Sequence, residues 1–171
     1  MIPGLYSLTS LNLAIKAAPS DWRPLVFTNG CFDLIHAGHV RYLKSAKALG
    51  KMLVVGLNSD ESVQTLKPRK HHLPAKPIVP EIQRAEVLAA LKPVDAVIIF
   101  AETTATQTIE TLKPDIYVKG GDYNLDRLPE ASAVQTYGGC IELIDIEVPI
   151  STTAIIQYIL SSARTDNNFL T

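Results

Sequence analysis

One stretch decides the fold of this chain: Leu25-Val26-Phe27-Thr28-Asn29-Gly30-Cys31-Phe32-Asp33-Leu34-Ile35-His36-Ala37-Gly38-His39. Residues 25–27 are short and apolar, which predicts a buried strand, and Gly30 lets the backbone turn where that strand ends. Residues 40–49 then place apolar side chains at helical spacing, and Gly50 suits a helix C-terminus. The stretch therefore predicts a strand, a glycine turn and a helix that begins at two histidines.

The start of this helix has the features of a phosphate site. The first turn of a helix carries unpaired N–H groups and a partial positive charge, and both attract anions. His36 and His39 are three residues apart, so they point to the same side of the turn. Gly38 lies between them and removes a side chain where phosphates would approach the backbone. We predict that both histidines donate hydrogen bonds to a phosphate chain.

The rest of the chain alternates strands with helices. Further strands are expected at residues 52–57, 94–100, 115–119 and 140–144, and further helices at 106–113, 134–137 and 152–160. Asn58 and Glu61 form a capping pair that would open another helix, and Pro80 suits the first turn of the next. That next helix would bury a stripe of Ile82, Ala85, Leu88 and Leu91. Such alternation favours an α/β fold, a single doubly wound parallel sheet of the Rossmann-like kind.

Polar clusters follow several expected strands at their carboxyl ends, where open α/β sheets bind ligands. They lie at residues 28–39, 58–61, 119–123 and 151–153. We expect these clusters to converge on one crevice.

The composition of the chain argues against several classes of binding partner. The chain has 171 residues, 47% hydrophobic content and a net charge of -1. A chain of this size can bury a hydrophobic core. It has no dense basic run beyond residues 67–72, and it has no apolar run of membrane-spanning length. We therefore expect no nucleic-acid or membrane partner. Residues 1–13 lack a secretory signal, which makes the cytoplasm the expected location. Two scattered cysteines provide neither a disulfide framework nor a paired-cysteine metal site.

Three segments are expected. Residues 1–24 would be an N-terminal extension with a short amphipathic helix ended by Pro19. Residues 25–160 would be the α/β domain that carries the motifs, and residues 161–171 a polar tail.

The motifs, read in order, resemble a known family. His36-Ala37-Gly38-His39 is similar to the HxGH signature of the cytidylyltransferase-like nucleotidyltransferases. Together with residues 27–33, 57–62, 119–123 and 151–156, it closely resembles the adenylyltransferase domain of ADP-heptose synthase. The resemblance implies the HxGH nucleotidyltransferase fold, here as a stand-alone transferase because the chain has no room for a preceding kinase domain.

The resemblance also implies a reaction. ATP and a sugar 1-phosphate, with D-glycero-β-D-manno-heptose 1-phosphate as the leading acceptor, would give an ADP-sugar and pyrophosphate by in-line attack on the α-phosphorus. Mg²⁺ would enter with the triphosphate, and related enzymes often form homodimers. Such a transfer needs alignment and charge neutralisation more than a protein nucleophile.

Residue type and the resemblance together assign the expected roles. The expected catalytic residues are His36, His39 and Lys67. The expected nucleotide-binding residues are Thr28, Asn29, Gly30, Phe32, Gly38, His39, Arg84, Gly121, Asp122, Ser151, Thr152 and Thr153. The expected acceptor-binding residues are Asp33, Lys76, Lys119 and Asp122, and no protein side chain is assigned to a metal.

Several simpler interpretations stay open. Ser151 could serve only as a helix N-cap, Arg84 as a solvated helix residue and Lys67 as part of a solvated loop. The histidine pair could bind zinc, although no third ligand lies at helical spacing.

Two alternative functions also stay open. One is a cytidylyltransferase that acts on glycerol 3-phosphate or another polyol phosphate, and the other is a nucleotide-binding module without turnover. The family usually carries Arg-Pro where this chain has Lys76-Pro77, and glycine where it has Val148-Pro149-Ile150. An ammonium cannot form the bidentate fork of a guanidinium, so the acceptor half of the site is expected to differ.

Overall fold

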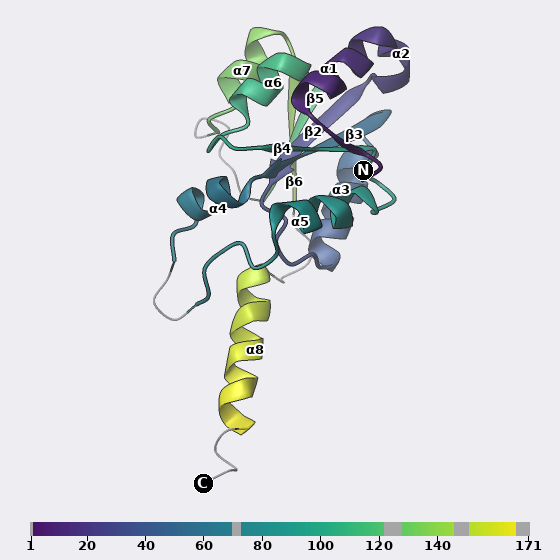
Figure 1. Cartoon of the computed structure of the whole chain (residues 1–171). Helices are drawn as coiled ribbons and strands as arrows, with labels where there is room; N and C mark the ends of the chain where they lie inside the picture. The colour runs from purple at the N-terminus through teal and green to yellow at the C-terminus, as the bar shows by residue number, and fades with distance from the viewer. Residues whose placement is uncertain (1, 70–72, 122–127, 146–150, 167–171) are drawn as a thin grey trace.

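The fold is described from a computed structural model that covers residues 2–69, 73–121, 128–145 and 151–166 (Figure 1). In these residues the strands form one six-stranded sheet in the order β1-β4-β3-β2-β5-β6, with every neighbouring pair parallel. Their bounds are β1 (Leu5–Tyr6), β2 (Leu25–Gly30), β3 (Met52–Asn58), β4 (Ala96–Phe100), β5 (Ile116–Gly120) and β6 (Cys140–Ile144). The predicted doubly wound α/β sheet is confirmed.

Helices cover both faces of this sheet. Their bounds are α1 (Leu8–Ala17), α2 (Pro19–Trp22), α3 (Ala37–Lys47), α4 (Asp60–Leu66), α5 (Glu81–Ala89), α6 (Thr106–Leu112), α7 (Ala131–Thr136) and α8 (Thr152–Asp166). Figure 1 shows α1, α2, α6 and α7 on one side of the sheet and α3 and α5 on the other. A parallel sheet needs such cover, because its strands are apolar on both faces.

Each face of the sheet has its own core. Successive strand residues point to opposite faces, so Val26 packs with Leu43 and Leu88 beneath α3 and α5, whereas Phe27 packs with Leu11 beneath α1. The ring of Phe27 stacks on that of Tyr117 across the β2–β5 pair, with centroids 6.1 Å apart. Two packed cores therefore hold the central strands that carry the polar clusters.

Strand β1 was not predicted. Its two residues add an edge to the sheet by pairing with β4, Leu5 opposite Val97 and Tyr6 opposite Ile98. Two residues carry no periodicity, so only the neighbouring strand reveals them as a strand. The amphipathic helix that follows was expected, and its Leu11 and Ile15 are buried in the core.

The prediction for α5 was partly wrong. Ala85 and Leu88 are buried as expected, but Ile82 is 51% exposed and Arg84 only 1% exposed. The N-cap of α4 also differs from the predicted pair, because Ser59 Oγ accepts from Ser62 N at 3.1 Å. The side chain of Asn58 instead donates to Ser62 Oγ at 2.9 Å.

Helix α8 is longer than expected. It continues to Asp166, so residues 161–166, which were assigned to a polar tail, are helical. Figure 1 shows this helix projecting away from the body of the domain. Among the described helices, none combines the length and the apolar character that crossing a bilayer requires.

Candidate active site

A cavity of about 310 Å³ lies at the carboxyl ends of β2 and β5. The chain runs from β2 through β3 to β4 on one side and returns to place β5 on the other side of β2, so the cavity lies where the strand order reverses. Open α/β sheets bind their ligands at this point. The cavity is lined by Asn29, Gly30, Cys31, Phe32, Asp33, His36, Gly38, His39, Tyr42, Val63, Lys67, Lys76, Lys119, Gly120, Ser151, Thr152 and Thr153.

The two histidines lie face to face at the start of α3. His36 is the N-cap residue, and its ring centroid is 3.9 Å from that of His39, with 34° between the planes. The backbone N–H of His36 donates to Nδ1 of His39 at 3.4 Å. Because Nδ1 of His39 is an acceptor, a neutral His39 carries its proton on Nε2. This nitrogen is then the donor that His39 can offer to a ligand.

Burial keeps both imidazoles neutral near pH 7. Burial, with smaller contributions from His36 and Lys67, lowers the pKa of His39 to about 4. Burial also lowers the pKa of His36. Nδ1 of His36 is buried and has no hydrogen-bond partner within the described part of the chain. Each neutral imidazole still offers one N–H donor to a phosphate oxygen.

Phe32 packs against this pair in a strained backbone conformation. Its φ of 42° lies in the left-handed region, which non-glycine residues rarely adopt, and the residue is 6% exposed. Its ring centroid is 5.4 Å from that of His39. A Cβ on Gly30 would lie 3.1 Å from the Phe32 ring, so this glycine provides room for the aromatic side chain.

Three lysines bring positive charge to the cavity. Lys67 follows α4, Lys76 lies in the loop before α5, and Lys119 lies on β5. Lys76 Nζ donates to Thr153 Oγ1 at 2.9 Å, and Lys119 Nζ donates to Asn29 Oδ1 at 2.8 Å. Burial lowers the pKa of Lys119, against the raising influence of Glu130 and Cys31. A polyanion is the ligand that such a lining suits.

The first turn of α8 closes another side of the cavity. Ser151 Oγ accepts from the backbone N–H of Ala154 at 3.1 Å, so Ser151 caps this helix, as the simpler interpretation holds. Ser151, Thr152 and Thr153 all line the cavity as well. Ser151 therefore both caps α8 and lines the cavity.

Asp33 ties the loop after β2 to the loop before α5. Its carboxylate accepts from the backbone N–H groups of Ile78 and Val79 at 2.9–3.0 Å, and both carboxylate oxygens take part. Asp33 lines the cavity at 7% exposure. The carboxylate thus positions the loop that carries Lys76.

Arg84 lies outside the cavity lining, contrary to what we expected of a phosphate ligand. Its guanidinium is buried and donates to the backbone oxygens of Cys31, Asn58 and Val79 at 2.5–3.0 Å. It also pairs with the carboxylate of Asp60 at 2.7 Å. These four acceptors make Arg84 an internal tie between the turn after β2, the end of β3 and α5.

Other expected site residues lie away from the cavity or outside the described residues. Thr28 is fully buried, and its Oγ1 is 2.6 Å from Tyr42 Oη. Gly121 is described, with a φ of 105°, but does not line the cavity, and Asp122 lies outside the described residues. None of residues 58–61 lines the cavity, so this cluster does not converge as predicted.

Sequence reasoning missed four lining residues, which are Cys31, Tyr42, Val63 and Gly120. Tyr42 follows His39 by three residues, a helical spacing that could have identified it. Its hydroxyl donates to the backbone oxygen of Val118 at 3.1 Å. A Cβ on Gly120 would lie 2.8 Å from the Tyr42 ring, which is why glycine stands there.

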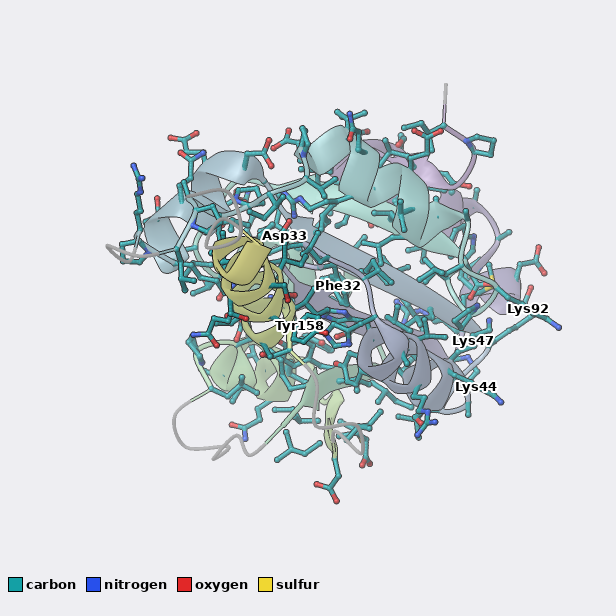
Figure 2. The ribbon with its side chains drawn as sticks, turned by 90° about the horizontal axis from the view of Figure 1, so that it is seen from below. Phe32, Asp33, Lys44, Lys47, Lys92 and Tyr158 are labelled. Carbon is teal, nitrogen blue, oxygen red and sulfur yellow. The ribbon has the colours of Figure 1, made fainter. Side chains whose placement is uncertain are left out.

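Other basic residues lie elsewhere. Figure 2 labels Phe32 and Asp33 near α8, whereas Lys44, Lys47 and Lys92 lie together on a distant part of the molecule. Lys47 pairs with Asp95 at 2.6 Å. Within the described ranges, no three His, Cys, Asp or Glu side chains are grouped so that they could hold a metal ion.

Comparison with known proteins identifies the family of this chain. The family model described as cytidylyltransferase-like matches residues 27–158. The chain belongs to this family. Family membership identifies it as a nucleotidyltransferase domain, as its motifs predicted.

Curated members of the family include long relatives. The bifunctional protein HldE of Syntrophotalea carbinolica is 50% identical over 151 residues, which are 88% of this chain and 30% of that protein. The bifunctional protein HldE of Geotalea uraniireducens is 48% identical over 153 residues, 90% of this chain and 30% of that protein. The chain thus spans about a third of the length of these relatives.

Solved structures share the fold. The lipopolysaccharide core biosynthesis protein from Thermoplasma volcanium is similar with a TM-score of 0.58 and 31% identity, over 71% of this chain and 94% of that one. Pantothenate synthetase from Thermus thermophilus has a TM-score of 0.52 at 15% identity, over 83% of this chain and 60% of that one, which shows the fold alone.

Proposed function

We propose that this cytidylyltransferase-like domain transfers an adenylyl group from ATP to a sugar 1-phosphate, with D-glycero-β-D-manno-heptose 1-phosphate as the leading acceptor. The observation that carries the proposal is the stacked pair of His36 and His39 at the start of α3, in a cavity that Lys67, Lys76 and Lys119 also line. Resemblance to the HldE relatives supports ATP and a heptose phosphate as the substrates.

The chemistry needs no protein nucleophile. A phosphate oxygen of the sugar 1-phosphate attacks the α-phosphorus of ATP, and the bond between that phosphorus and the bridging oxygen breaks. Pyrophosphate leaves with the electron pair of the broken bond. His39 Nε2 and a ring N–H of His36 would donate to oxygens on which charge builds, and Lys67 would add a nearby positive charge.

The remaining lining residues divide between the two substrates in this proposal. Ser151, Thr152 and Thr153 would bind phosphate oxygens of the nucleotide at the start of α8. Lys76 and Lys119 would hold the phosphate of the acceptor, with Asp33 keeping the loop of Lys76 in place.

Magnesium would enter with the triphosphate. Mg²⁺ in such sites is usually held by substrate phosphates and one or two carboxylates. Among the described residues, Asp33 is the carboxylate that lines the cavity, and both of its oxygens already accept backbone N–H groups. The described residues therefore fit a magnesium ion carried mainly by the phosphates, where it would offset their negative charge.

Pyrophosphate release tests the proposal. ATP and CTP are each combined, with magnesium, with heptose 1-phosphate, other sugar 1-phosphates and glycerol 3-phosphate. Turnover with ATP and heptose 1-phosphate supports the proposed reaction, and ATP-dependent turnover with another sugar phosphate reassigns the acceptor. Turnover with CTP and glycerol 3-phosphate supports the cytidylyltransferase alternative. Nucleotide binding without turnover for any pair supports the non-catalytic module.

A cytoplasmic location, a homodimer and the absence of nucleic-acid or membrane partners complete the proposal. Sedimentation of the purified protein tests the homodimer directly. Twice the mass of the chain supports it, and the mass of a single chain contradicts it.

A further inference from the structure

Asn29 holds its side-chain amide in one orientation at the edge of the cavity. Its Oδ1 accepts from Tyr117 Oη and from Lys119 Nζ, each at 2.8 Å. A lysine ammonium is a donor only, so the atom that faces it must be the carbonyl oxygen of the amide and not the nitrogen. The amide nitrogen of Asn29 is therefore turned away from these two residues.

The sheet sets this arrangement. Phe27 on β2 is the register partner of Tyr117 on β5, so Asn29 and Lys119 follow two residues later on the same face. Tyr117 is fully buried and its ring stacks on Phe27, which fixes the position from which its hydroxyl reaches Asn29. A Cβ on Gly56 would lie 2.6 Å from the Phe27 ring and 3.3 Å from Asn29 Cβ, so this glycine makes room for both side chains.

The free end of the amide faces the ligand space. Asn29 and Lys119 line the cavity, whereas Tyr117 lies beneath them without reaching it. No described residue accepts a hydrogen bond from Asn29 Nδ2. With Oδ1 occupied by Tyr117 and Lys119, the two N–H groups of Nδ2 are left for a ligand in the cavity.

We propose that Tyr117 is a positioning residue that keeps the Asn29 amide nitrogen facing the cavity, where it donates to a phosphate oxygen of the substrate. The identity of the substrate rests on the proposed function, because either the nucleotide or the sugar phosphate could supply this oxygen. Without the Tyr117 hydroxyl, Lys119 alone holds Oδ1, so the amide is held less firmly and its two N–H donors are less well aimed at an anion.

The main test compares Tyr117→Phe with Tyr137→Phe. Both changes remove one buried hydroxyl from the same core cluster, but that of Tyr137 has no hydrogen-bond partner among the described residues and lies outside the cavity lining. Calorimetry on the full chain measures the Kd of ATP with magnesium, and separately that of heptose 1-phosphate. We expect Tyr117→Phe to raise one of these values about fivefold, the size of one lost neutral hydrogen bond. Tyr137→Phe should leave both unchanged, and the ligand affected identifies the source of the phosphate.

Changes at Asn29 test the orientation itself. Asn29→Asp keeps an oxygen for Tyr117 and Lys119 but replaces the two cavity-facing donors with a carboxylate oxygen, so the same Kd should rise tenfold or more. In an Asn29→Ala background, Tyr117→Phe should have no further effect, because its influence passes through Asn29. A purely structural role of Tyr117 would lower the melting temperature without this dependence on Asn29.

The outcomes separate the two proposals. Equal Kd values for wild type and Tyr117→Phe, or an undiminished effect in the Asn29→Ala background, would overturn the positioning role alone. Ligand binding that responds as expected, but without any pyrophosphate release, would overturn the transferase function and leave the positioning role standing. A wild-type protein that binds neither ligand would overturn both.

Discussion

At the scale of single residues, the protonation state of His39 follows from its surroundings. The side chain is packed against Phe32 and His36, and its Nδ1 accepts a backbone N–H. Burial deprives the charged imidazole of the water that would stabilise it, which is why its pKa falls to about 4. Neutrality and a fixed tautomer together make His39 a donor through Nε2.

Replacing His39 with alanine should lower kcat by on the order of 10²-fold, because a donor aimed at developing charge is lost. Steady-state pyrophosphate release measures the effect, and circular dichroism confirms that the fold is kept. A near-normal kcat in a folded variant would remove His39 from the catalytic residues.

The same residue should make stability depend on pH. Its folded-state pKa of about 4 lies below its unfolded value of 6.5, so the unfolded chain binds the proton first as the pH falls. His39 therefore costs no stability above pH 6.5, and the free energy of unfolding decreases as the pH drops from 6.5 toward 4. The slope should be below the roughly 1.4 kcal/mol per pH unit of one full proton, since the side chain is partly exposed.

Urea denaturation at pH 7.5, 6.0 and 5.0 checks this dependence. The variant His39→Gln cannot take up a proton and should show a flatter profile. Profiles of equal slope for the variant and the wild type would contradict the lowered pKa.

At the scale of elements, Arg84 joins segments that are far apart in the sequence. One guanidinium on α5 holds the carbonyl of Cys31 after β2, that of Asn58 at the end of β3, and the carboxylate of Asp60 at the start of α4. The turn that leads to the histidines is thus anchored by a helix that does not reach the cavity.

Changing Arg84 to lysine should destabilise the fold by roughly 3 kcal/mol, because an ammonium cannot serve acceptors in several directions and leaves buried partners unsatisfied. Urea denaturation measures the loss. The matched control is Arg69→Lys, at an exposed position, which should change stability by less than about 0.5 kcal/mol. A loss of nucleotide binding in an Arg84→Lys protein of normal stability would instead favour the direct phosphate contact first expected.

At the scale of the whole molecule, the helices on the two sides of the sheet differ in their relation to the cavity. The face beneath α3 and α5 adjoins the helix that carries the histidines, whereas α1 and α6 pack on the other face and contribute no residue to the cavity lining. Stability and catalysis should therefore be separable by substitutions in α1, which contributes no residue to the cavity lining.

Leu11→Ala tests this separation. Leu11 is fully buried in the core beneath α1, so its truncation should cost about 3 kcal/mol of stability while KM for both substrates stays unchanged. Leu13→Ala on the same helix is the control, because Leu13 is 63% exposed and should have little effect. A large rise in KM for Leu11→Ala would show that α1 is coupled to the cavity.

The amino-acid sequence by itself determined the alternation of elements, the glycine turn with its histidines and the edge of the sheet that forms the site. These features are local, because the hydrophobic period, the turn glycines and the helix starts each depend on residues that are neighbours in the sequence. The order of the motifs along the chain also sufficed to indicate the family, which the match over residues 27–158 confirms.

Only the tertiary structure decided what Arg84, Tyr117 and β1 do. Arg84 has the sequence context of a solvated helix residue, and its burial depends on carbonyls that three other segments bring to it. The orientation of the Asn29 amide likewise depends on two side chains about 90 positions away. Hydrogen bonds between distant segments depend on directions in space, and no spacing along the chain encodes those directions.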